Sequence, residues 1–390
     1  MYKLGVIGLG GRISSDGGVL WNFFQYCNEF CVTAIADPDS AGVKKKVQAH
    51  PAYYSQTLQI FDDADEMLDQ ADVDGILIGT RDNLHTEMAI KAMRKKVPIF
   101  LEKPISTTIE DALRLKEAMD TYHPKVLVSF PLRYSDITTE VKKIIDAGTI
   151  GEVLQVEAFD DVPYGRCFYH SWMRDESITG GLWTQKATHD FDLYNYILND
   201  TPKAVYASEV RKLFKGDMPA GMKCEACSKT RTCPESPYTI EHVYHDEKTG
   251  PYCCFAKDTG NHDCGTAILN YKSGVLLSFS QNFFARFSAA RRGARFYGYK
   301  GTLEFDFYKS EIKVYLHTSP RVDTYKYDEQ KVTHFGGDLK LAELFLNMLS
   351  GTDTQSYLAE GLESVLTCLM AQRSCETGER ITPEKLGYRR

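Results

Sequence analysis

The sequence predicts an α/β protein of two domains, with a doubly wound parallel sheet first and antiparallel strands after it. Over residues 1–130, short apolar strands alternate with helical segments, which favours parallel strands joined by right-handed crossovers. Polar residues directly follow these strands, as they do at the ligand-binding edge of such a sheet. Over residues 265–317, consecutive strands are joined by short turns, which indicates an antiparallel sheet.

Length and charge limit the classes of function. A chain of 390 residues is long enough for two domains, which we place at 1–130 and 131–390. The net charge of −7 provides no general basic field for nucleic acid. No apolar run approaches the roughly 20 residues of a membrane span, and the first strand begins without a signal-peptide pattern. We therefore expect a cytoplasmic protein that binds neither nucleic acid nor a membrane.

A glycine-rich turn follows the first predicted strand, Lys3–Ile7. Its sequence is Gly8-Leu9-Gly10-Gly11-Arg12-Ile13, whose glycines permit a tight turn and the close approach of a pyrophosphate to backbone N–H groups. Ile13 stands where a third Gly or Ala is common, a position that mainly serves packing between helix and strand. The turn is a candidate dinucleotide site, and a glycine turn without a ligand is the alternative.

An acidic residue ends the next predicted strand, Cys31–Ala36. Asp37 follows the first glycine by 29 residues (37 − 8), and an insertion at Ser14–Gly18 explains why this exceeds the usual spacing of about 20. A carboxylate at this point accepts hydrogen bonds from adenosine ribose hydroxyls and repels a 2′-phosphate. The sequence thus favours NAD over NADP. NADP stays an alternative because of the lysine run 44–46, which could also be a solvated helix face.

Two further strand ends carry polar residues. A strand over 74–80 leads into Arg81-Asp82-Asn83-Leu84-His85, and the apolar strand Ile99–Leu101 ends in Glu102-Lys103-Pro104. A lysine at this point is poorly explained by packing, because Lys is rarely buried unless it is paired. The candidate cofactor-binding residues are Gly8, Gly10, Gly11, Arg12, Ile13, Asp37, Thr80, Arg81, Asn83, His85, Glu102 and Lys103.

Chemically active residue types also gather in the second half of the chain. Gly180-Gly181 leads into a segment in which Gln185, His189 and Asp192 would share one face of a single helix. One imidazole, one ammonium group (Lys186), one amide and two carboxylates lie within eight residues. This density favours a functional site over a surface helix with a stray histidine.

An insertion of about residues 208–265 interrupts the strand pattern and is rich in cysteine. Cys224, Cys227 and Cys233 have a spacing like that of a zinc knuckle. A thiolate zinc site would stabilise a long loop of low apolar content. The fourth ligand is open among Cys254, Cys253, Cys264, His242, His245 and His262. We predict structural zinc at Cys224, Cys227, Cys233 and Cys254, with free thiols and an iron–sulfur cluster as alternatives.

Taken in order, these motifs resemble the Gfo/Idh/MocA family, the glucose–fructose oxidoreductase and inositol dehydrogenase relatives. The resemblance covers nearly the whole chain. It implies a Rossmann domain followed by an α/β domain with a large, mostly antiparallel sheet through which a homodimer or homotetramer forms. It also implies NAD(P)-dependent oxidation or reduction of a carbohydrate or polyol hydroxyl. It rests on Gly8-x-Gly10, Asp37, Thr80, Asn83, His85, Glu102-Lys103-Pro104, Gly180-Gly181, His189 and Asp192.

By position, Lys103 and His189 match the catalytic lysine and histidine of the family. The family pattern D-x-x-x-H becomes Gln185-x-x-x-His189 here, so Lys186 or Asp190 is the candidate substitute for the carboxylate. We expect His189 to act as the base, since an imidazole ordinarily titrates near pH 6.5, and Lys103 to stabilise the developing alkoxide. The candidate substrate-binding residues are Arg133, Tyr134, Gln185, Lys186 and Asp192.

Three activities are compatible with these residues. The first, which we predict, is a sugar or polyol dehydrogenase with freely exchanging NAD. The second is a glycosidase that oxidises its substrate, eliminates the aglycone, adds water and reduces again with retained NAD, as some members of the family do. The third is a non-catalytic NAD-binding sensor, against which the presence of both Lys103 and His189 argues.

Overall fold

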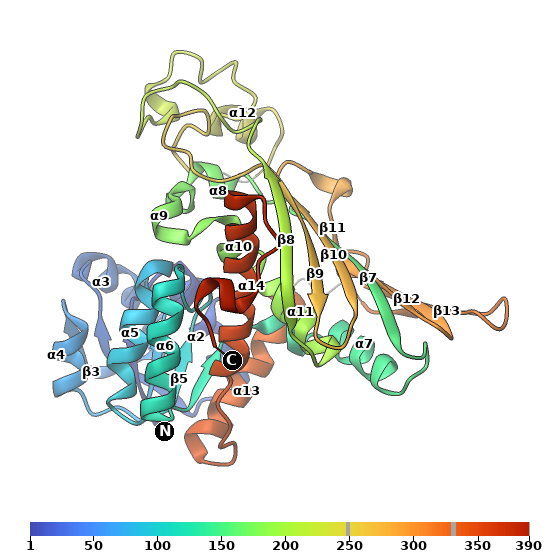
Figure 1. The fold of residues 1–390 in the computed structure, drawn as a ribbon. Coiled ribbons are helices and arrows are strands. Elements are labelled where there is room, and N and C mark those ends of the chain that lie inside the picture. The colour runs from blue at the N-terminus through green and yellow to red at the C-terminus, as the bar shows by residue number, and fades with distance from the viewer. Residues whose placement is uncertain (247–249, 329–332, 390) are drawn as a thin grey trace. The chain divides into compact units, whose positions relative to one another are not determined.

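The computed structural model describes residues 1–246, 250–328 and 333–389 and divides into two compact units (Figure 1). Unit 1 comprises Met1–Lys143, Thr188–Asn199 and Asp328–Leu369. Unit 2 comprises Ile144–Ala187, Asp200–Tyr327 and Met370–Arg390. The first unit therefore includes two segments from the second of the predicted domains. None of the described helices is long and apolar enough to cross a membrane.

Unit 1 is built on six parallel strands. These are β1 (Tyr2–Ile7), β2 (Phe30–Ala36), β3 (Tyr54–Phe61), β4 (Gly75–Ile78), β5 (Ile99–Leu101) and β6 (Val126–Val128). Their order, β3-β2-β1-β4-β5-β6, is that of a doubly wound dinucleotide-binding sheet. β4 and β5 are buried throughout, as apolar strands covered on both faces must be. The predicted parallel sheet is confirmed.

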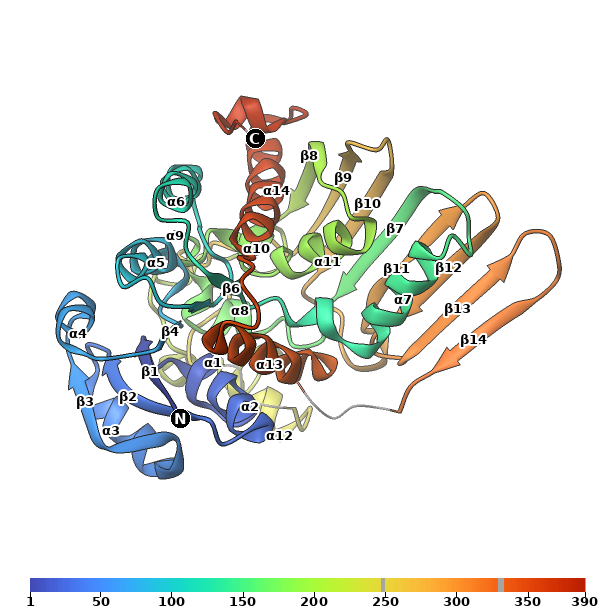
Figure 2. The same ribbon diagram turned by 90° about the horizontal axis from the view of Figure 1, so that it is seen from below.

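Helices cover this sheet. Those of unit 1 are α1 (Gly11–Ser14), α2 (Val19–Tyr26), α3 (Ser40–Ala49), α4 (Ala64–Gln70), α5 (His85–Met93), α6 (Ile109–Tyr122), α11 (Thr188–Leu198) and α13 (Gly337–Ser350), while α7 (Asp136–Asp146) and α14 (Leu358–Thr377) belong partly to each unit. Figure 2 shows α4, α5 and α6 on one side of the sheet and α2 and α13 on the other.

An aromatic cluster fixes α13 to the N-terminal half of unit 1. The Phe345 ring lies 5.7 Å from Phe23 of α2 and 5.8 Å from Phe100 of β5, between ring centroids. All three side chains are buried in one apolar cluster. Because such contacts remove large apolar surfaces from water, the segment 328–369 packs as part of the parallel-sheet unit.

The helix predicted to carry Gln185, His189 and Asp192 on one face is broken. α10 (Gly181–Gln185) ends where the N–H groups of the next two residues both donate to the Leu182 carbonyl. α11 then begins at Thr188. The expectation of one continuous helix is therefore wrong for Gln185, whereas His189 and Asp192 do lie on one helix, three residues apart.

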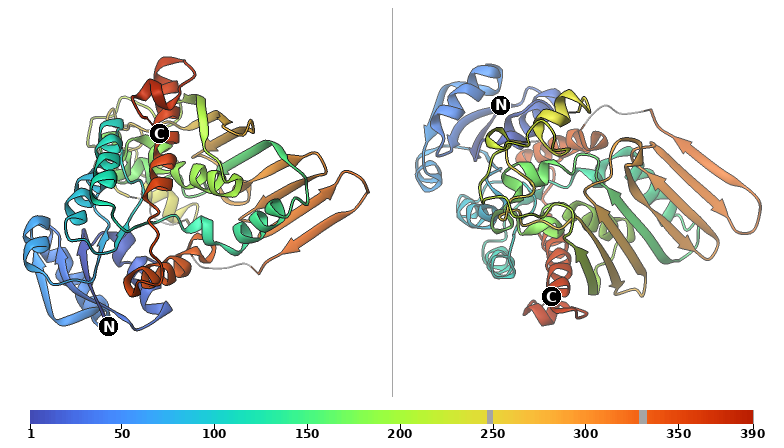
Figure 3. Two further views of the ribbon diagram at one scale, coloured as in Figure 1. Left: turned by 60° about the horizontal axis from the view of Figure 1, so that its bottom comes forward. Right: turned by 90° about the horizontal axis from the view of Figure 1, so that it is seen from above.

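Unit 2 is built on an eight-stranded, mostly antiparallel sheet. Its strands are β7 (Val153–Asp161), β8 (Pro202–Val210), β9 (Cys264–Tyr271), β10 (Leu276–Asn282), β11 (Arg291–Gly298), β12 (Gly301–Asp306), β13 (Glu311–Leu316) and β14 (Val322–Lys326). The order is β14-β13-β12-β11-β7-β10-β9-β8, in which β10 and β7 are parallel. Figure 3 shows the β13–β14 hairpin in orange at one edge. The predicted fold class is confirmed.

Short helical segments complete the two units. In unit 2 these include α8 (Cys167–His170), α9 (Glu176–Thr179), α12 (Pro237–His242) and the 3-10 turns η4 (Trp172–Arg174), η5 (Cys224–Ala226), η6 (Phe287–Ala289) and η8 (Pro383–Leu386). In unit 1 the 3-10 turns are η1 (Pro51–Tyr53), η2 (Asp82–Leu84), η3 (Pro131–Tyr134) and η7 (Thr333–Gly336).

Candidate active site

The carboxyl ends of the parallel strands form one row. The residue after each strand donates its N–H to the last carbonyl of a neighbouring strand at 2.9–3.0 Å: Gly8 to Ala36, Asp37 to Phe61, Gly79 to Ile7, Glu102 to Ile78 and Ser129 to Leu101. The predicted site residues that follow these strands therefore lie along one edge, where open α/β sheets bind ligands. Thr80 is half-buried at this edge, and Arg81 and Asn83 are exposed.

The glycine turn is closed on one side and open on the other. Gly8 has φ +81°, and a Cβ there would lie 2.7 Å from the Thr80 nitrogen; a Cβ on Gly10 would lie 3.1 Å from the Gly79 oxygen. A Cβ built on Gly11 meets no atom within 4 Å, so the space beside the start of α1 is open. A turn packed against β4 and open on its outer side fits a bound pyrophosphate.

The turn departs from the common motif in two ways, and both are accommodated. Ile13 is fully buried, and a Cβ on Gly79 would overlap its side chain, so Gly79 provides the room that a small residue at position 13 usually provides. The predicted insertion after α1 is closed by Asn22, whose amide donates to the carbonyls of Gly17 and Gly18 at 3.0 and 2.8 Å. Both features leave the turn itself intact.

Asp37 is attached to the glycine turn. Its Oδ2 accepts the N–H of Leu9 and its Oδ1 accepts the N–H of Asp39, both at 2.9 Å. Lys46 donates to the carbonyl of the same Leu9, whereas the other two lysines of the run 44–46 are exposed. The lysine run is thus partly a support for the turn and partly a solvated helix face.

His85 holds the loop that follows β5. It is buried, and its Nδ1–H donates to the Pro104 carbonyl at 2.7 Å. The neighbouring Thr86 hydroxyl donates to the Ile105 carbonyl at 2.8 Å. The peptide bond between Lys103 and Pro104 is cis. The start of α5 therefore positions the segment that carries Lys103. His85 helps to build the ligand-binding edge of the sheet through its hydrogen bond to Pro104.

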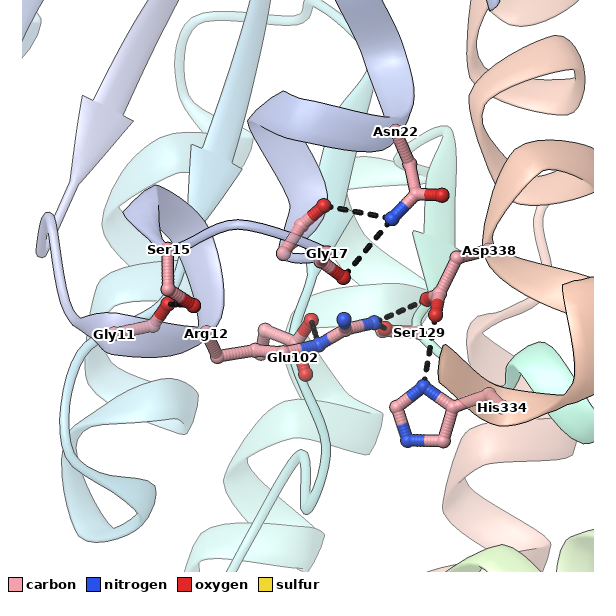
Figure 4. A network of polar contacts seen from close by, with 10 residues as sticks. Gly11, Arg12, Ser15, Gly17, Asn22, Glu102, Ser129, His334 and Asp338 are labelled. Atoms are coloured by element: carbon pink, nitrogen blue, oxygen red, sulfur yellow. Dashed lines mark hydrogen bonds and ion pairs between the residues drawn. The ribbon is translucent and has the colours of Figure 1, made fainter. Parts of the chain in front are cut away.

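Arg12 joins α1 to the ends of β5 and β6 and to α13 (Figure 4). Its Nε lies 3.0 Å from Glu102 Oε1, and its Nη2 lies 2.5 Å from Asp338 Oδ1 and 3.4 Å from Ser129 Oγ. Burial opposes the charge of Arg12, but the two carboxylates outweigh it and raise the pKa of Arg12. Arg12 and Glu102, both predicted to contact the cofactor, bind each other in the structure.

Two neighbouring side chains stabilise the ionised form of Asp338. Burial on its own would raise the pKa of this carboxyl group, but the Arg12 guanidinium and a hydrogen bond from His334 lower the pKa of Asp338 to about 2. Neither His334 nor Asp338 is among the predicted site residues. The signal in the sequence is the run Gly336-Gly337-Asp338 with a histidine two residues before it, which indicates a helix start without revealing the partners.

α11 places His189 at the end of β6. The imidazole packs edge-to-face on Phe130, two residues beyond the strand, with 6.3 Å between ring centroids. Lys103 likewise follows the last residue of β5 by two positions. Since β5 and β6 are neighbours in the sheet, the chain segments that hold Lys103 and His189 meet at adjacent strand ends.

Arg133 and Asp192, two predicted substrate-binding residues, bind each other. Arg133 Nε lies 2.7 Å from Asp192 Oδ2 and its Nη2 lies 2.5 Å from Oδ1, and both residues are buried. Burial opposes the guanidinium charge, but Asp192 outweighs it and raises the pKa of Arg133. Tyr134, a third predicted residue, packs against the apolar cluster of α2 and α13. The ion pair ties η3 to α11, one turn away from His189.

Unit 2 contains the remaining residues of the predicted site. The ammonium group of Lys186 pairs with Asp160 of β7, whose carboxylate also lies 3.5 Å from Arg292 Nε, and all three residues are buried. Gln185 Nε2 lies 3.7 Å from Met173 Sδ. Lys186, predicted as a catalytic group, is thus the partner of a buried carboxylate, an arrangement typical of a structural ion pair.

The predicted zinc centre is not supported. Within the described ranges, no group of three or more His, Cys, Asp or Glu side chains is arranged to hold a metal ion. Cys254 belongs to an apolar cluster with Phe168 and Phe283, whereas Cys224 and Cys253 belong to a different one. None of the eleven cysteines, all of which lie within the described residues, forms a disulfide, and Cys224 is buried.

The strand order, the open glycine turn and the acid after β2 together define a dinucleotide-binding protein. Comparison with known proteins agrees with this class. Residues 2–130 match the model described as "Oxidoreductase family, NAD-binding Rossmann fold", and residues 138–304 match the GFO/IDH/MocA C-terminal domain. The chain belongs to the Gfo/Idh/MocA family of NAD-binding oxidoreductases, as the motifs indicated.

Two named proteins are similar in sequence to this chain. The Bacillus subtilis protein YteT, whose name assigns it to the oxidoreductases, is 27% identical over 85% of this chain and 88% of its own length. A myo-inositol 2-dehydrogenase of Thermotoga maritima is 25% identical over 53% of this chain and 57% of that protein.

Solved structures share the fold. A levoglucosan dehydrogenase in complex with NADH and levoglucosan superposes with a TM-score of 0.74 at 17% identity, covering 98% of this chain and 99% of that one. An oxidoreductase domain protein from Kribbella flavida gives 0.76 at 17% identity, with 97% and 98% covered. At these identities the similarity establishes the architecture alone.

Proposed function

We propose that the protein transfers a hydride between NAD and a CH–OH carbon of a carbohydrate or polyol. The observation that carries the proposal is the placement of Lys103 and His189 at the ends of two adjacent strands of the dinucleotide-binding sheet. At that edge an imidazole can take the proton of an alcohol and a cation can stabilise the negative charge that develops on its oxygen. The inositol dehydrogenases among the named relatives support the substrate class.

The cofactor would be held by the residues along the strand ends. Within the glycine turn the open space lies beside Gly11, and Asp37 stands after β2, where ribose hydroxyls would meet it. A carboxylate at that point favours NAD over NADP. NAD, when bound, supplies the hydride acceptor, and everything else in the reaction falls to side chains of the protein.

His189 and Lys103 divide the remaining chemistry. His189 takes the hydroxyl proton as the hydride leaves, a contribution of about 10²–10⁴-fold in rate for a positioned base. Lys103 stabilises the negative charge that develops on the oxygen and orients the hydroxyl. Arg133 and Asp192 act indirectly in this scheme, because their ion pair fixes α11 and hence the position of His189.

The test is kinetic. Wild-type protein is offered NAD with a panel of sugars, polyols, glycosides and uronates, while NADH absorbance and aglycone release are both followed. We expect NADH to accumulate, and we expect Lys103→Ala and His189→Asn each to lower kcat by about 10²-fold or more with NAD affinity nearly unchanged. Lys116→Ala, at a half-buried position of α6, and His123→Asn, at the exposed end of that helix, are the matched controls.

Three results would contradict parts of the proposal. Full activity in either site variant would remove that residue from the mechanism. Aglycone release without NADH accumulation would identify a redox-neutral glycosidase in place of a dehydrogenase. NADP turning over faster than NAD would reverse the assignment that rests on Asp37.

A further inference from the structure

A chain of contacts from three other segments of unit 1 ends on His334 (Figure 4). Glu102 binds Arg12, Arg12 binds Oδ1 of Asp338, and Oδ2 of Asp338 lies 2.8 Å from Nδ1 of His334. An ionised carboxylate only accepts hydrogen bonds, so Nδ1 of His334 carries the shared proton. Nε2 is then the nitrogen at which the neutral ring takes up a second proton.

The charges along this chain favour a proton on His334. Two carboxylates and one guanidinium give a formal charge of −1 (−1 + 1 − 1) when His334 is neutral, and protonation of the imidazole brings the sum to zero. Asp338 is buried, where an opposite charge is favoured more strongly than in water. A carboxylate that fixes both the ring and the tautomer of a histidine is the arrangement used in catalytic His–Asp pairs.

His334 is also a neighbour of His189. Their ring centroids lie 5.5 Å apart with the planes tilted by 39°. His189 is 7% exposed, whereas the His334 side chain is 28% exposed. His334 and Phe335 both have left-handed backbone conformations, with φ of +48° and +55°, which residues of these types seldom adopt. Strain of this kind is characteristic of functional positions.

We propose that His334 is a proton-relay residue, which receives the proton from His189 and passes it to solvent. This inference rests on the proposed function, in which His189 takes the proton of the substrate hydroxyl. It extends that function by identifying where the proton goes. A buried base needs such an exit, because it must be deprotonated again before the next turnover.

The proton balance of the relay is complete. During oxidation the substrate carbon gives up a hydride to the cofactor, and the hydroxyl oxygen gives up a proton to His189. The cationic His189 then donates to Nε2 of His334, directly or through one water, and His334 releases the proton to bulk water. Reduction runs the same transfers in reverse, and no further reactant is required.

Other charged groups lie on the elements around His334 and influence the proton affinity of the relay. Arg133 and Asp192 neutralise each other as an ion pair, and Glu102 is engaged by Arg12. The segments packed against η7 and α13 are η3, α2 and β6, whose titratable and charged groups are Arg133, Tyr134 and Tyr26. The other such groups near His334 are those already described: Arg12, Glu102, Asp338 and His189.

Two substitutions separate a relay from a structural role. His334→Asn keeps a hydrogen-bond donor for Asp338 but cannot take up a proton. His334→Gly relieves the left-handed backbone and leaves space for added imidazole. We expect both to lower kcat by about tenfold or more in weak buffer with KM and NAD affinity nearly unchanged, and we expect imidazole to restore much of the activity of His334→Gly. The control is His123→Gly, at an exposed position with φ +46°.

A second measurement does not depend on turnover. Carbon-13-labelled histidine reports the titration of each imidazole by NMR, and the signals of His189 and His334 are assigned by their loss in His189→Asn and His334→Asn. A proton on either ring disfavours a proton on the other, so we expect the midpoint of His189 to rise in His334→Asn. His123→Asn should leave it unchanged.

The outcomes distinguish this inference from the function on which it rests. Wild-type turnover in His334→Asn, a loss in His334→Gly that imidazole does not restore, or an unchanged midpoint of His189 would each overturn the relay while leaving the dehydrogenase in place. If the wild-type protein oxidises no alcohol, the proposed function fails, and the NMR titration alone decides whether the two imidazoles are coupled.

Discussion

Asp338 is the residue on whose ionisation the Arg12 network depends. Its pKa of about 2 lies below the value of about 3.9 for an aspartate in an unfolded chain. A carboxylate whose pKa is lowered by folding contributes stability above its unfolded pKa, and this contribution is lost as the pH falls through the folded pKa. For Asp338 the difference corresponds to about 2.5 kcal/mol.

We therefore expect Asp338→Asn to lower the free energy of unfolding by about 2 kcal/mol near neutral pH. The difference between wild type and variant should shrink as the pH falls from about 4 towards 2, where wild-type Asp338 is also protonated. Urea unfolding at a series of pH values measures this difference. Asp120→Asn on α6 is the exposed control, and a difference that stays constant over the acidic range would contradict an ionised network.

Residue types at the strand ends could be predicted from the sequence, but their partners could not. A glycine, an acid or a lysine after an apolar strand is visible in the chain itself. The partnership of Arg12 with Asp338 joins positions 326 residues apart, and nothing local to either one indicates it. For the same reason the sequence does not reveal that Lys186 pairs with the buried carboxylate of Asp160.

At the scale of elements, the contact between Ile13 of α1 and Gly79 after β4 replaces the third glycine of the common motif. We expect Gly79→Ala to destabilise the protein by about 1–3 kcal/mol, because the added methyl overlaps Ile13. Combining it with Ile13→Ala should cost less than the sum of the two single changes, since the methyl then fills vacated space. Thermal and urea unfolding of the four proteins measure this coupling.

Gly11→Ala is the matched control for Gly79→Ala. Its methyl group meets no atom within 4 Å, so stability should change little. The same methyl projects into the space proposed for the pyrophosphate, so NAD affinity should fall. Strict additivity of the Ile13 and Gly79 changes would show that the two side chains do not share one space.

The predicted strands and the missed strands differ in burial. β3, β8 and β14 have no counterpart among the elements predicted from the sequence. Each lies at the edge of its sheet, and β14 is largely exposed. An edge strand is more exposed to solvent than a central one and carries more polar residues. The apolar periodicity that reveals a central strand is therefore weak there.

At the scale of the whole molecule, the fold class and the alternation of elements were predictable, whereas the composition of the units was not. The segments 188–199 and 328–369 return to the unit that holds the parallel sheet. A helix carrying His189 and Asp192 was predicted from the sequence, but a helical pattern does not say which apolar surface the helix will cover. The consequence is functional, because His189 and Asp338 both reach the parallel sheet through these returning segments.

One face of the second sheet is partly apolar across three neighbouring strands, and Arg380 contacts it through a hydrogen bond to Asn270. Tyr206 of β8 and Ile268 of β9 face each other in register and are 45% and 43% exposed. Leu276 of β10 continues the face and is 41% exposed. Small polar side chains fill the positions between them, at Ser208, Thr266, Asn270, Ser278 and Ser280. An exposed, partly apolar surface of this kind is typical of a contact with another protein.

We expect this face to join two copies of the chain, as predicted for the second domain, and light scattering after size exclusion should give at least twice the monomer mass of 44.1 kDa. Ile268→Glu should shift the protein to the monomer, because a symmetric contact brings both carboxylates into one apolar interface. Leu213→Glu places the same charge at an exposed position outside the sheet and should leave the mass unchanged. Circular dichroism must show that both variants are folded. A monomeric wild type, or an Ile268→Glu protein with the wild-type mass, would mean that this face of the sheet is not the contact.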